Sequence, residues 1–146
     1  MTVYSETFNI HTNERDLFHD ITQKVQSIVT KSKIMNGLVT VTVLHTTCGL
    51  TLNEWDPNLF ADLYDLLEKV IPKALRMGHY RHPAPKHVDR LLNAHSHLRS
   101  VIIGQSQTIP VNEGKVQLGT YQKFIFIELE GLLEKDRRIF VQIMGE

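Results

Sequence analysis

Alternating apolar and polar residues predict β-strands in the first and last parts of the chain. Thr2–Ile10 alternates in this way, and Leu38–Leu44 is rich in β-branched residues with its valines on one face. Similar short runs predict further strands over Leu50–Asn53, Thr108–Val111, Lys115–Leu118, Phe124–Leu129 and Ile139–Met144. Asn112-Glu113-Gly114 lies between two of these runs and is typical of a tight hairpin turn.

Apolar residues at helical spacing predict three helices between these strands. The first has a cap at Thr12 or Asn13, carries apolar residues from Leu17 to Val29 and ends near Ser32. The second begins at Asp56-Pro57, where Asp is the cap and Pro takes the first helical position, and Pro72 ends it. The third covers Val88–Ile103 and stops at Gly104. Between the last two, residues 73–87 form the longest irregular stretch, a loop of a length that is often functional.

The pattern as a whole predicts an α+β protein with about seven strands, paired mainly antiparallel, and about three helices. A length of 146 residues fits one domain covering residues 1–146. Lys+Arg and Asp+Glu both number 16, so no basic excess favours nucleic acid or an anionic membrane as a partner. The single cysteine, Cys48, suits a reducing compartment. With neither a signal peptide nor an apolar run long enough to span a bilayer, we expect a cytoplasmic protein.

Histidine is the residue type whose distribution stands out. The chain has eight, and five of them (His79, His82, His87, His95 and His97) lie in one short stretch. If this segment is helical, His95 and His97 point about 200° apart, and Asn93 shares a face with His97. If it is a strand, the two histidines share a face. A metal site, with zinc as the natural ion and His82 completing the cluster, therefore stays open beside ordinary surface histidines.

Other candidate residues have a plain structural interpretation beside a functional one. His45 follows a strand and suits either a ligand-orienting role or a backbone hydrogen bond. Glu54 precedes a helix, where it suits a general base or simply complements the helix dipole. Thr120 and Gln122 alternate with Tyr121, which predicts that both face one side of a strand. Cys48 lacks an evident activating partner, so we expect an inert packing role.

Three segments carry a resemblance to a known family. Residues 45–54 read HTTCGLTLNE, residues 80–82 and 93–100 read YRH and NAHSHLRS, and residues 106–122 contain SQTIPV, a glycine and GTYQ. In this order and spacing they resemble the YjbQ-like proteins, usually labelled secondary thiamine-phosphate synthase. The chain departs from that pattern at three positions: it has Tyr121 where Trp is usual, Cys48 where a small residue is usual, and Trp55 where a polar residue is usual.

The resemblance implies an antiparallel β-sandwich flanked by helices, assembled as a cytoplasmic homotrimer. It implies a synthase that joins hydroxymethylpyrimidine pyrophosphate to thiazole phosphate and releases pyrophosphate. For such chemistry we expect a site whose residues have three roles: catalysis by His45, Glu54 and Gln122; binding of the phosphorylated substrate by Thr46, Thr47, Asn53, Arg81, Asn93, Arg99 and Thr120; and zinc or magnesium held by His45, His82 and His97.

Two other interpretations remain beside the synthase. One is a metal-dependent hydrolase of unknown substrate, with the three histidines as ligands and Glu54 as base. The other is a trimeric ligand-binding protein without catalytic activity. The chain is too short for a TIM barrel of roughly 250 residues, the fold of the usual thiamine-phosphate synthase, so any such activity needs a different scaffold.

Overall fold

A computed structural model describes residues 1–15, 17–73, 76, 79–82, 92–131 and 135–146. The elements of the described residues, in chain order, are β1 (Thr2–Thr12), β2 (Phe18–Asp20), α1 (Thr22–Ser32), β3 (Gly37–Val43), β4 (Cys48–Asn53), α2 (Pro57–Val70), α3 (Ala94–Ile103), β5 (Ser106–Asn112), β6 (Lys115–Val116), β7 (Lys123–Glu128) and β8 (Lys135–Gly145). This is the predicted α+β composition.

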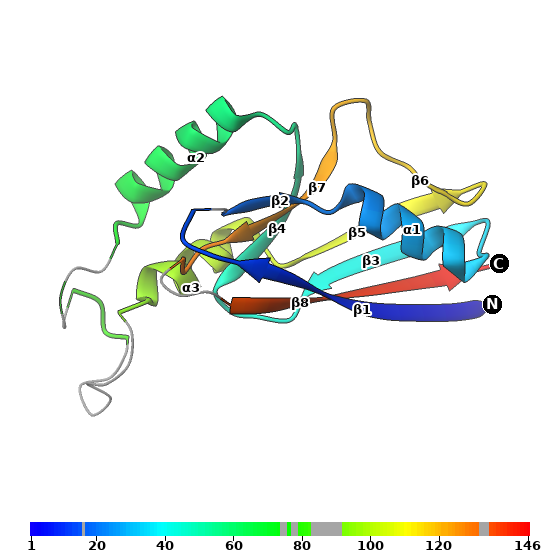
Figure 1. Ribbon diagram of the computed structural model, residues 1–146, viewed down its shortest axis with the longest axis horizontal. Helices are drawn as coiled ribbons and strands as arrows, with labels where there is room; N and C mark the ends of the chain where they lie inside the picture. Colours follow the sequence, from blue (N-terminus) through cyan, green and yellow to red (C-terminus); the bar gives the residue numbers. More distant parts are fainter. Residues whose placement is uncertain (16, 74–75, 77–78, 83–91, 132–134) are drawn as a thin grey trace.

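The strands form two antiparallel sheets (Figure 1). The larger sheet has the order β1-β8-β3-β5-β6, and the smaller has the order β2-β7-β4. The centre of the larger sheet is β8, which pairs along most of its length with β1 on one side and β3 on the other. Gly145 of β8 lies opposite Thr2 of β1 and opposite Gly37 of β3. A Cβ atom on Gly37 would lie 2.1 Å from the carbonyl oxygen of Met144, so the close approach of β3 to β8 at this position requires glycine.

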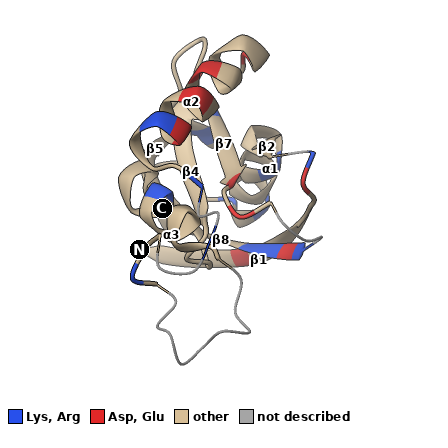
Figure 2. Cartoon of the chain, turned by 90° about the vertical axis from the view of Figure 1, so that its left-hand side faces the viewer, with Lys and Arg blue, Asp and Glu red and all other residues tan. Residues whose placement is uncertain are grey.

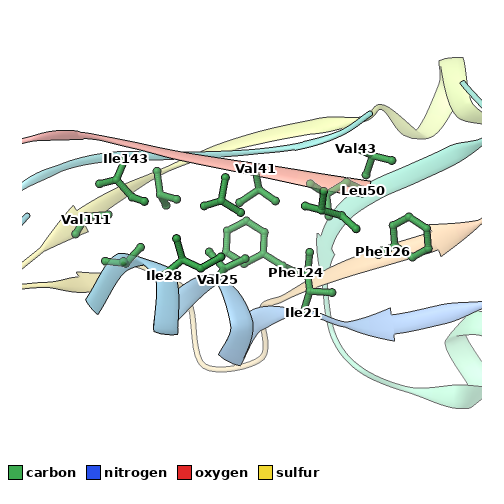
Figure 3. Packing of buried hydrophobic residues seen from close by; sticks show 14 of the residues in the cluster. Ile21, Val25, Ile28, Val41, Val43, Leu50, Val111, Phe124, Phe126 and Ile143 are labelled. Carbon is green, nitrogen blue, oxygen red and sulfur yellow. The ribbon is translucent and has the colours of Figure 1, made fainter. Parts of the chain in front are cut away.

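The main core fills the space between the larger sheet and a second layer made of α1 and the smaller sheet (Figure 3). Val25 and Ile28 on α1 face Val41 and Ile143 on the larger sheet, and Phe124 of β7 lies among them (Figure 3). All five are essentially inaccessible to solvent. The valine face predicted for residues 38–44 is therefore the core face of β3.

Strand β7 is buried on both faces, which explains its continuous apolar sequence. Phe124 and Phe126 point into the main core, whereas Ile125 and Ile127 point to the other side of the smaller sheet. There they pack with residues of α2 and with Ile103 of α3. The arrangement is a β-sandwich with helices beside and over the smaller sheet, as expected.

The start of the first helix differs from the prediction. Residues Phe18–Asp20 form β2, and helix α1 begins at Thr22, whose backbone N–H donates to Oδ1 of Asp20 at 2.9 Å. Phe18 pairs with Ile127 of β7 and stacks on Phe60 of α2. Pairing with an available sheet edge therefore overrides the helical spacing of the apolar residues before Thr22.

Two other predicted elements also need correction. Helix α3 begins at Ala94 with Asn93 as its N-cap, and residues 88–91 of the predicted helix lie outside the described residues. Residues 119–122 form a turn rather than a strand, closed by the N–H of Gln122 on the carbonyl of Gly119. The predicted hairpin is confirmed: Glu113 and Gly114 both have positive φ between the paired strands β5 and β6.

The charged residues of helix α2 are mostly acidic, and the start of β8 carries Lys135, Arg137 and Arg138 around Asp136 (Figure 2). Among the described residues, the helices are too short or too polar to cross a bilayer.

Candidate functional site

The predicted site residues divide between the two ends of the β4–β7 ladder. At one end Cys48 pairs with Glu128, and at the other Asn53 pairs with Lys123. Five residue steps of about 3.4 Å separate these pairs, so the ends lie about 17 Å apart. Figure 1 shows α3 near the first end, and the β4–α2 and β6–β7 connections near the second. We call them the histidine end and the glutamine end.

Two histidines meet at the histidine end. The ring centroids of His82 and His97 are 4.9 Å apart in an edge-to-face arrangement. Burial lowers the pKa of His97, the neighbouring His82 lowers it further, and Glu130 and hydrogen bonding to the Thr46 backbone oppose the shift. The lowered pKa favours the neutral form of His97, and the residue whose backbone is bonded to it, Thr46, is exposed.

His45 is anchored to β8. Its Nε2 accepts a 2.8 Å hydrogen bond from the backbone N–H of Arg138. Its carbonyl oxygen accepts a 2.7 Å hydrogen bond from Nε2 of Gln105. Burial lowers the pKa of His45, and the charges of Arg137 and Arg138 act in the same direction. His45 is thus a neutral, fixed imidazole in this arrangement.

Helix α3 sends its two histidines in different directions, as helical spacing predicts. His95 and Arg99, four residues apart, are both buried and line a cavity of about 190 Å³ together with Tyr64 and Lys73. The guanidinium of Arg99 donates to the carbonyl of Ile71 at 2.7 Å from Nη2 and is paired with Glu68 at 2.8 Å. Arg99 therefore lies away from His97, and its predicted substrate contact would have to occur in this cavity.

Thr47 is the one predicted residue whose hydroxyl is buried. Its Oγ1 donates to Oε2 of Glu130 at 3.1 Å and accepts from Nη2 of Arg137 at 3.2 Å. Arg137 also forms two bonds to Glu128, of 2.6 Å and 2.7 Å. Lys135 lies 2.6 Å from Oε2 of Glu130. We call Thr12, Thr47, Glu128, Glu130, Lys135 and Arg137 the buried network.

Of the six residues of this network, only Thr47 was predicted from the sequence as a site residue. The signal for the network was the pair of carboxylates at positions 128 and 130, inside an otherwise apolar run. Asn93, predicted as a substrate contact, reaches the network instead: its Nδ2 lies 3.5 Å from Oε1 of Glu130. The network thus joins β8, the Thr47 turn and the start of α3.

The glutamine end brings the remaining predicted residues together. Asn53, Glu54, Thr120 and Gln122 are all exposed there. Oε1 of Gln122 accepts a 2.8 Å hydrogen bond from the N–H of Gly119, which leaves the amide NH₂ of Gln122 as its donor group. Arg81, next to His82, is exposed at the histidine end. Within one chain, His45 and Gln122 therefore do not share a site.

The predicted metal ligands do not form a metal centre in this arrangement. Nε2 of His45 already accepts the Arg138 N–H, and a neutral ring then carries its proton on Nδ1. That leaves His82 and His97 as a pair, and the described residues contain no group of three His, Cys, Asp or Glu side chains able to hold an ion. Zinc sites normally need at least three protein ligands, so the donor set does not fit one.

Comparison with known proteins gives one consistent family. The model of the family described as "UPF0047 protein YjbQ-like" matches residues 6–146. A UPF0047 protein of Methanothermobacter thermautotrophicus is 36% identical over 100% of this chain and 95% of its own length. YugU of Bacillus subtilis is 30% identical over 96% of this chain and 98% of its own.

Solved structures agree with these relatives. A hypothetical protein of Aeropyrum pernix superposes with a TM-score of 0.83 at 33% identity, covering 98% of this chain and 99% of that one. A protein of Sulfolobus solfataricus described as YbjQ-like and of unknown function gives a TM-score of 0.78 at 31% identity, covering 99% of this chain and 100% of that one. The fold described above is therefore the fold of these proteins.

Proposed function

The chain belongs to the UPF0047 family of YjbQ-like proteins, and from this membership we propose that it is an enzyme acting on phosphorylated small molecules. The reaction to test is thiamine-phosphate synthesis. The thiazole nitrogen attacks the methylene carbon of hydroxymethylpyrimidine pyrophosphate and forms a C–N bond. The C–O bond breaks, and its electron pair leaves with the pyrophosphate.

The observation that supports this proposal is the set of hydrogen-bond donors at the histidine end. Pyrophosphate leaves more easily where donors and cations stabilise the charge that develops on its oxygens. His97 and His82 are in ring contact there, and the backbone of the exposed Thr46 is hydrogen-bonded to His97. Arg81 is next to His82 in the chain. Binding of an anion would favour protonation of His97, which would then donate to the departing oxygen.

We also propose that a second copy of the chain completes the site, in a homotrimer. Glu54 and Gln122 are about 17 Å from the histidine end of their own chain, too far to share one small substrate with it. Apolar side chains on α3 are left at the surface of a single chain, with Val101 82% and Ile102 64% exposed. Light scattering should give the mass of three chains, and a stable monomer with full activity would contradict this assembly.

An assay with the two thiamine precursors tests the reaction. Thiamine phosphate and pyrophosphate should form in equal amounts, and His97→Gln and Gln122→Ala should each lower the rate roughly 100-fold. His11→Gln is the control, because His11 is an exposed histidine of β1 that contacts Asp136, at 3.1 Å, and is given no role in the reaction. If the wild-type rate equals the rates of His97→Gln and Gln122→Ala, the synthase proposal is abandoned.

The ring contact between His82 and His97 favours a second candidate, the metal-dependent hydrolase. It requires a third ligand from a neighbouring chain or from residues outside those described. Elemental analysis of the purified protein separates it from a non-catalytic binding protein, and the assay with the two thiamine precursors separates it from the synthase. Zinc or magnesium in stoichiometric amount, lost in His97→Gln but kept in His11→Gln, would favour it.

A further inference from the structure

His45 is fixed in a single protonation pattern by β8. The backbone N–H of Arg138 can only donate, so Nε2 of His45 must be unprotonated to accept its 2.8 Å hydrogen bond. A neutral imidazole with an unprotonated Nε2 carries its proton on Nδ1. His45 therefore offers a ring N–H donor, and the lone pair that a metal ion or a substrate proton would need is already engaged.

Thr47, two positions after His45, is also held by β8. Arg137 and Arg138 are consecutive on β8 and point to opposite faces, so Arg137 is buried while Arg138 is exposed. Nη2 of Arg137 donates to Oγ1 of Thr47, while the N–H of Arg138 donates to His45. Two adjacent residues of β8 thus hold both ends of the His45–Thr47 segment.

The hold on Thr47 is rigid because of the ion pairs behind it. Arg137 donates two bonds to Glu128, and the N–H of Glu130 donates to Oε1 of Glu128 at 3.0 Å. Glu130 in turn accepts the Thr47 hydroxyl. Each of these side chains is at least nine-tenths buried, and such bonds are short and orienting when water is excluded.

The charges near His45 are mostly positive. Arg137, Arg138 and Lys135 all act on the ring as cations, and Glu128 is the opposing carboxylate. An N–H donor in a cationic environment suits an oxyanion, which accepts hydrogen bonds and carries negative charge.

We propose that His45 binds an oxyanion of the substrate through its Nδ1–H, and that Thr47 is the positioning residue that holds this ring in place. The proposal rests on the proposed function in taking the substrate to be a phosphate or pyrophosphate ester. It gives His45 a binding role in place of a metal-ligand or general-base role.

The first test is the tautomer of His45. Nitrogen-15 spectra of the full chain at pH 8 distinguish a protonated from an unprotonated ring nitrogen, and a His45→Gln variant identifies the signals. We expect Nδ1 protonated and Nε2 unprotonated. A protonated Nε2 would overturn the proposal.

The second test compares two threonine hydroxyls, with inorganic pyrophosphate as the probe. Thr47→Val removes the hydroxyl that holds the His45 segment. Thr40→Val removes a hydroxyl that is hydrogen-bonded to Thr108 at 2.9 Å between β3 and β5, outside the buried network. Each change removes one hydroxyl, and thermal unfolding measures its effect on folding.

We expect pyrophosphate to shift the Nδ1 signal of His45 saturably in the wild type. Thr47→Val should weaken this binding roughly tenfold through lost preorganisation, while Thr40→Val retains the wild-type affinity. Equal affinities in both variants, or no shift of the Nδ1 signal, would overturn the proposal. Binding that behaves as expected in a protein without synthase activity would support this role for His45 and reject only the proposed reaction.

Discussion

Arg137 and Glu128 form a two-bond ion pair inside the molecule, with Nε to Oε2 at 2.6 Å and Nη2 to Oε1 at 2.7 Å. Both side chains are almost completely excluded from solvent. The pair lies between the Thr47 turn, β8 and the smaller sheet. Because Arg137 also donates to Thr47, the same ion pair that stabilises the fold holds the Thr47 turn at the histidine end.

Arg137→Met should strongly destabilise the protein. The substitution leaves the Glu128 carboxylate buried without its partner, which typically costs about 3–5 kcal/mol. Urea unfolding measures this loss. Arg138→Met is the matched control, because the neighbouring side chain is exposed and should change stability by less than about 0.5 kcal/mol. Similar losses in the two variants would contradict the role given to the pair.

Acid should weaken the buried network. Burial opposes ionisation of Glu128, but hydrogen bonds from Arg137 and Thr12 outweigh it and lower the pKa of this carboxyl below its usual 4.5. A lowered carboxyl pKa contributes stability above the unfolded value, and that stability is lost as pH falls through the folded pKa. The unfolding free energy should therefore drop below about pH 4.5.

In Glu128→Gln this acid-dependent drop should be smaller, because the titrating group is gone. Glu113→Gln, at an exposed hairpin position, serves as the control and should follow the wild-type curve. The measurement is the urea midpoint at a series of pH values from 7 to 3. A Glu128→Gln curve parallel to the wild type would count against the assignment.

His95 should also lower the stability on acidification, but over a pH interval above the one in which Glu128 acts. Burial lowers the pKa of His95 to about 4, and Arg99 and Lys73 act in the same direction. The unfolded ring takes up a proton near pH 6.5 while the folded ring stays neutral, so stability falls as pH drops from 6.5 toward 4. The full effect is at most about 3 kcal/mol.

The check is the slope of the unfolding free energy against pH in that interval. His95→Gln should flatten the slope, whereas His11→Gln, which changes an exposed histidine, should retain it. If His95→Gln leaves the slope unchanged, the neutral buried histidine is not its origin.

Cys48 should be unreactive in the folded protein. Its side chain is fully buried, and burial raises the pKa of the thiol to about 12, with Glu128 acting in the same direction. A thiol reagent at pH 8 should label the native chain only at the rate of unfolding, and label it at once in strong denaturant. Rapid labelling of the native protein would contradict the packing role.

Residues whose environment follows from local pattern were predictable. The alternation of Val39, Val41 and Val43 identified the core face of β3, and Asp56-Pro57 identified the start of α2, where Asp56 accepts from the N–H of Asn58. Helical spacing also separated His95 from His97 correctly. In each case the deciding interactions are within the element or on its own face.

The predictions that were wrong concern residues whose environment depends on contacts outside their own element. Phe18 joined a strand because β7 offered it an edge, and Thr120 lies in a turn that closes through Gly119. Motif order along the chain also could not show that Glu54 and Gln122 lie about 17 Å from the histidine end. Distance between motifs depends on the strand register that joins them.

By itself, therefore, the sequence determined the family, the α+β class and most element positions, because these follow from periodicity and motif content. Only the tertiary structure decided which nitrogen of His45 carries the proton, and that Thr47 and Arg99 turn their polar groups inward. The physical reason is that a polar side chain takes its role from the partners that burial places around it, and those partners come from distant parts of the chain.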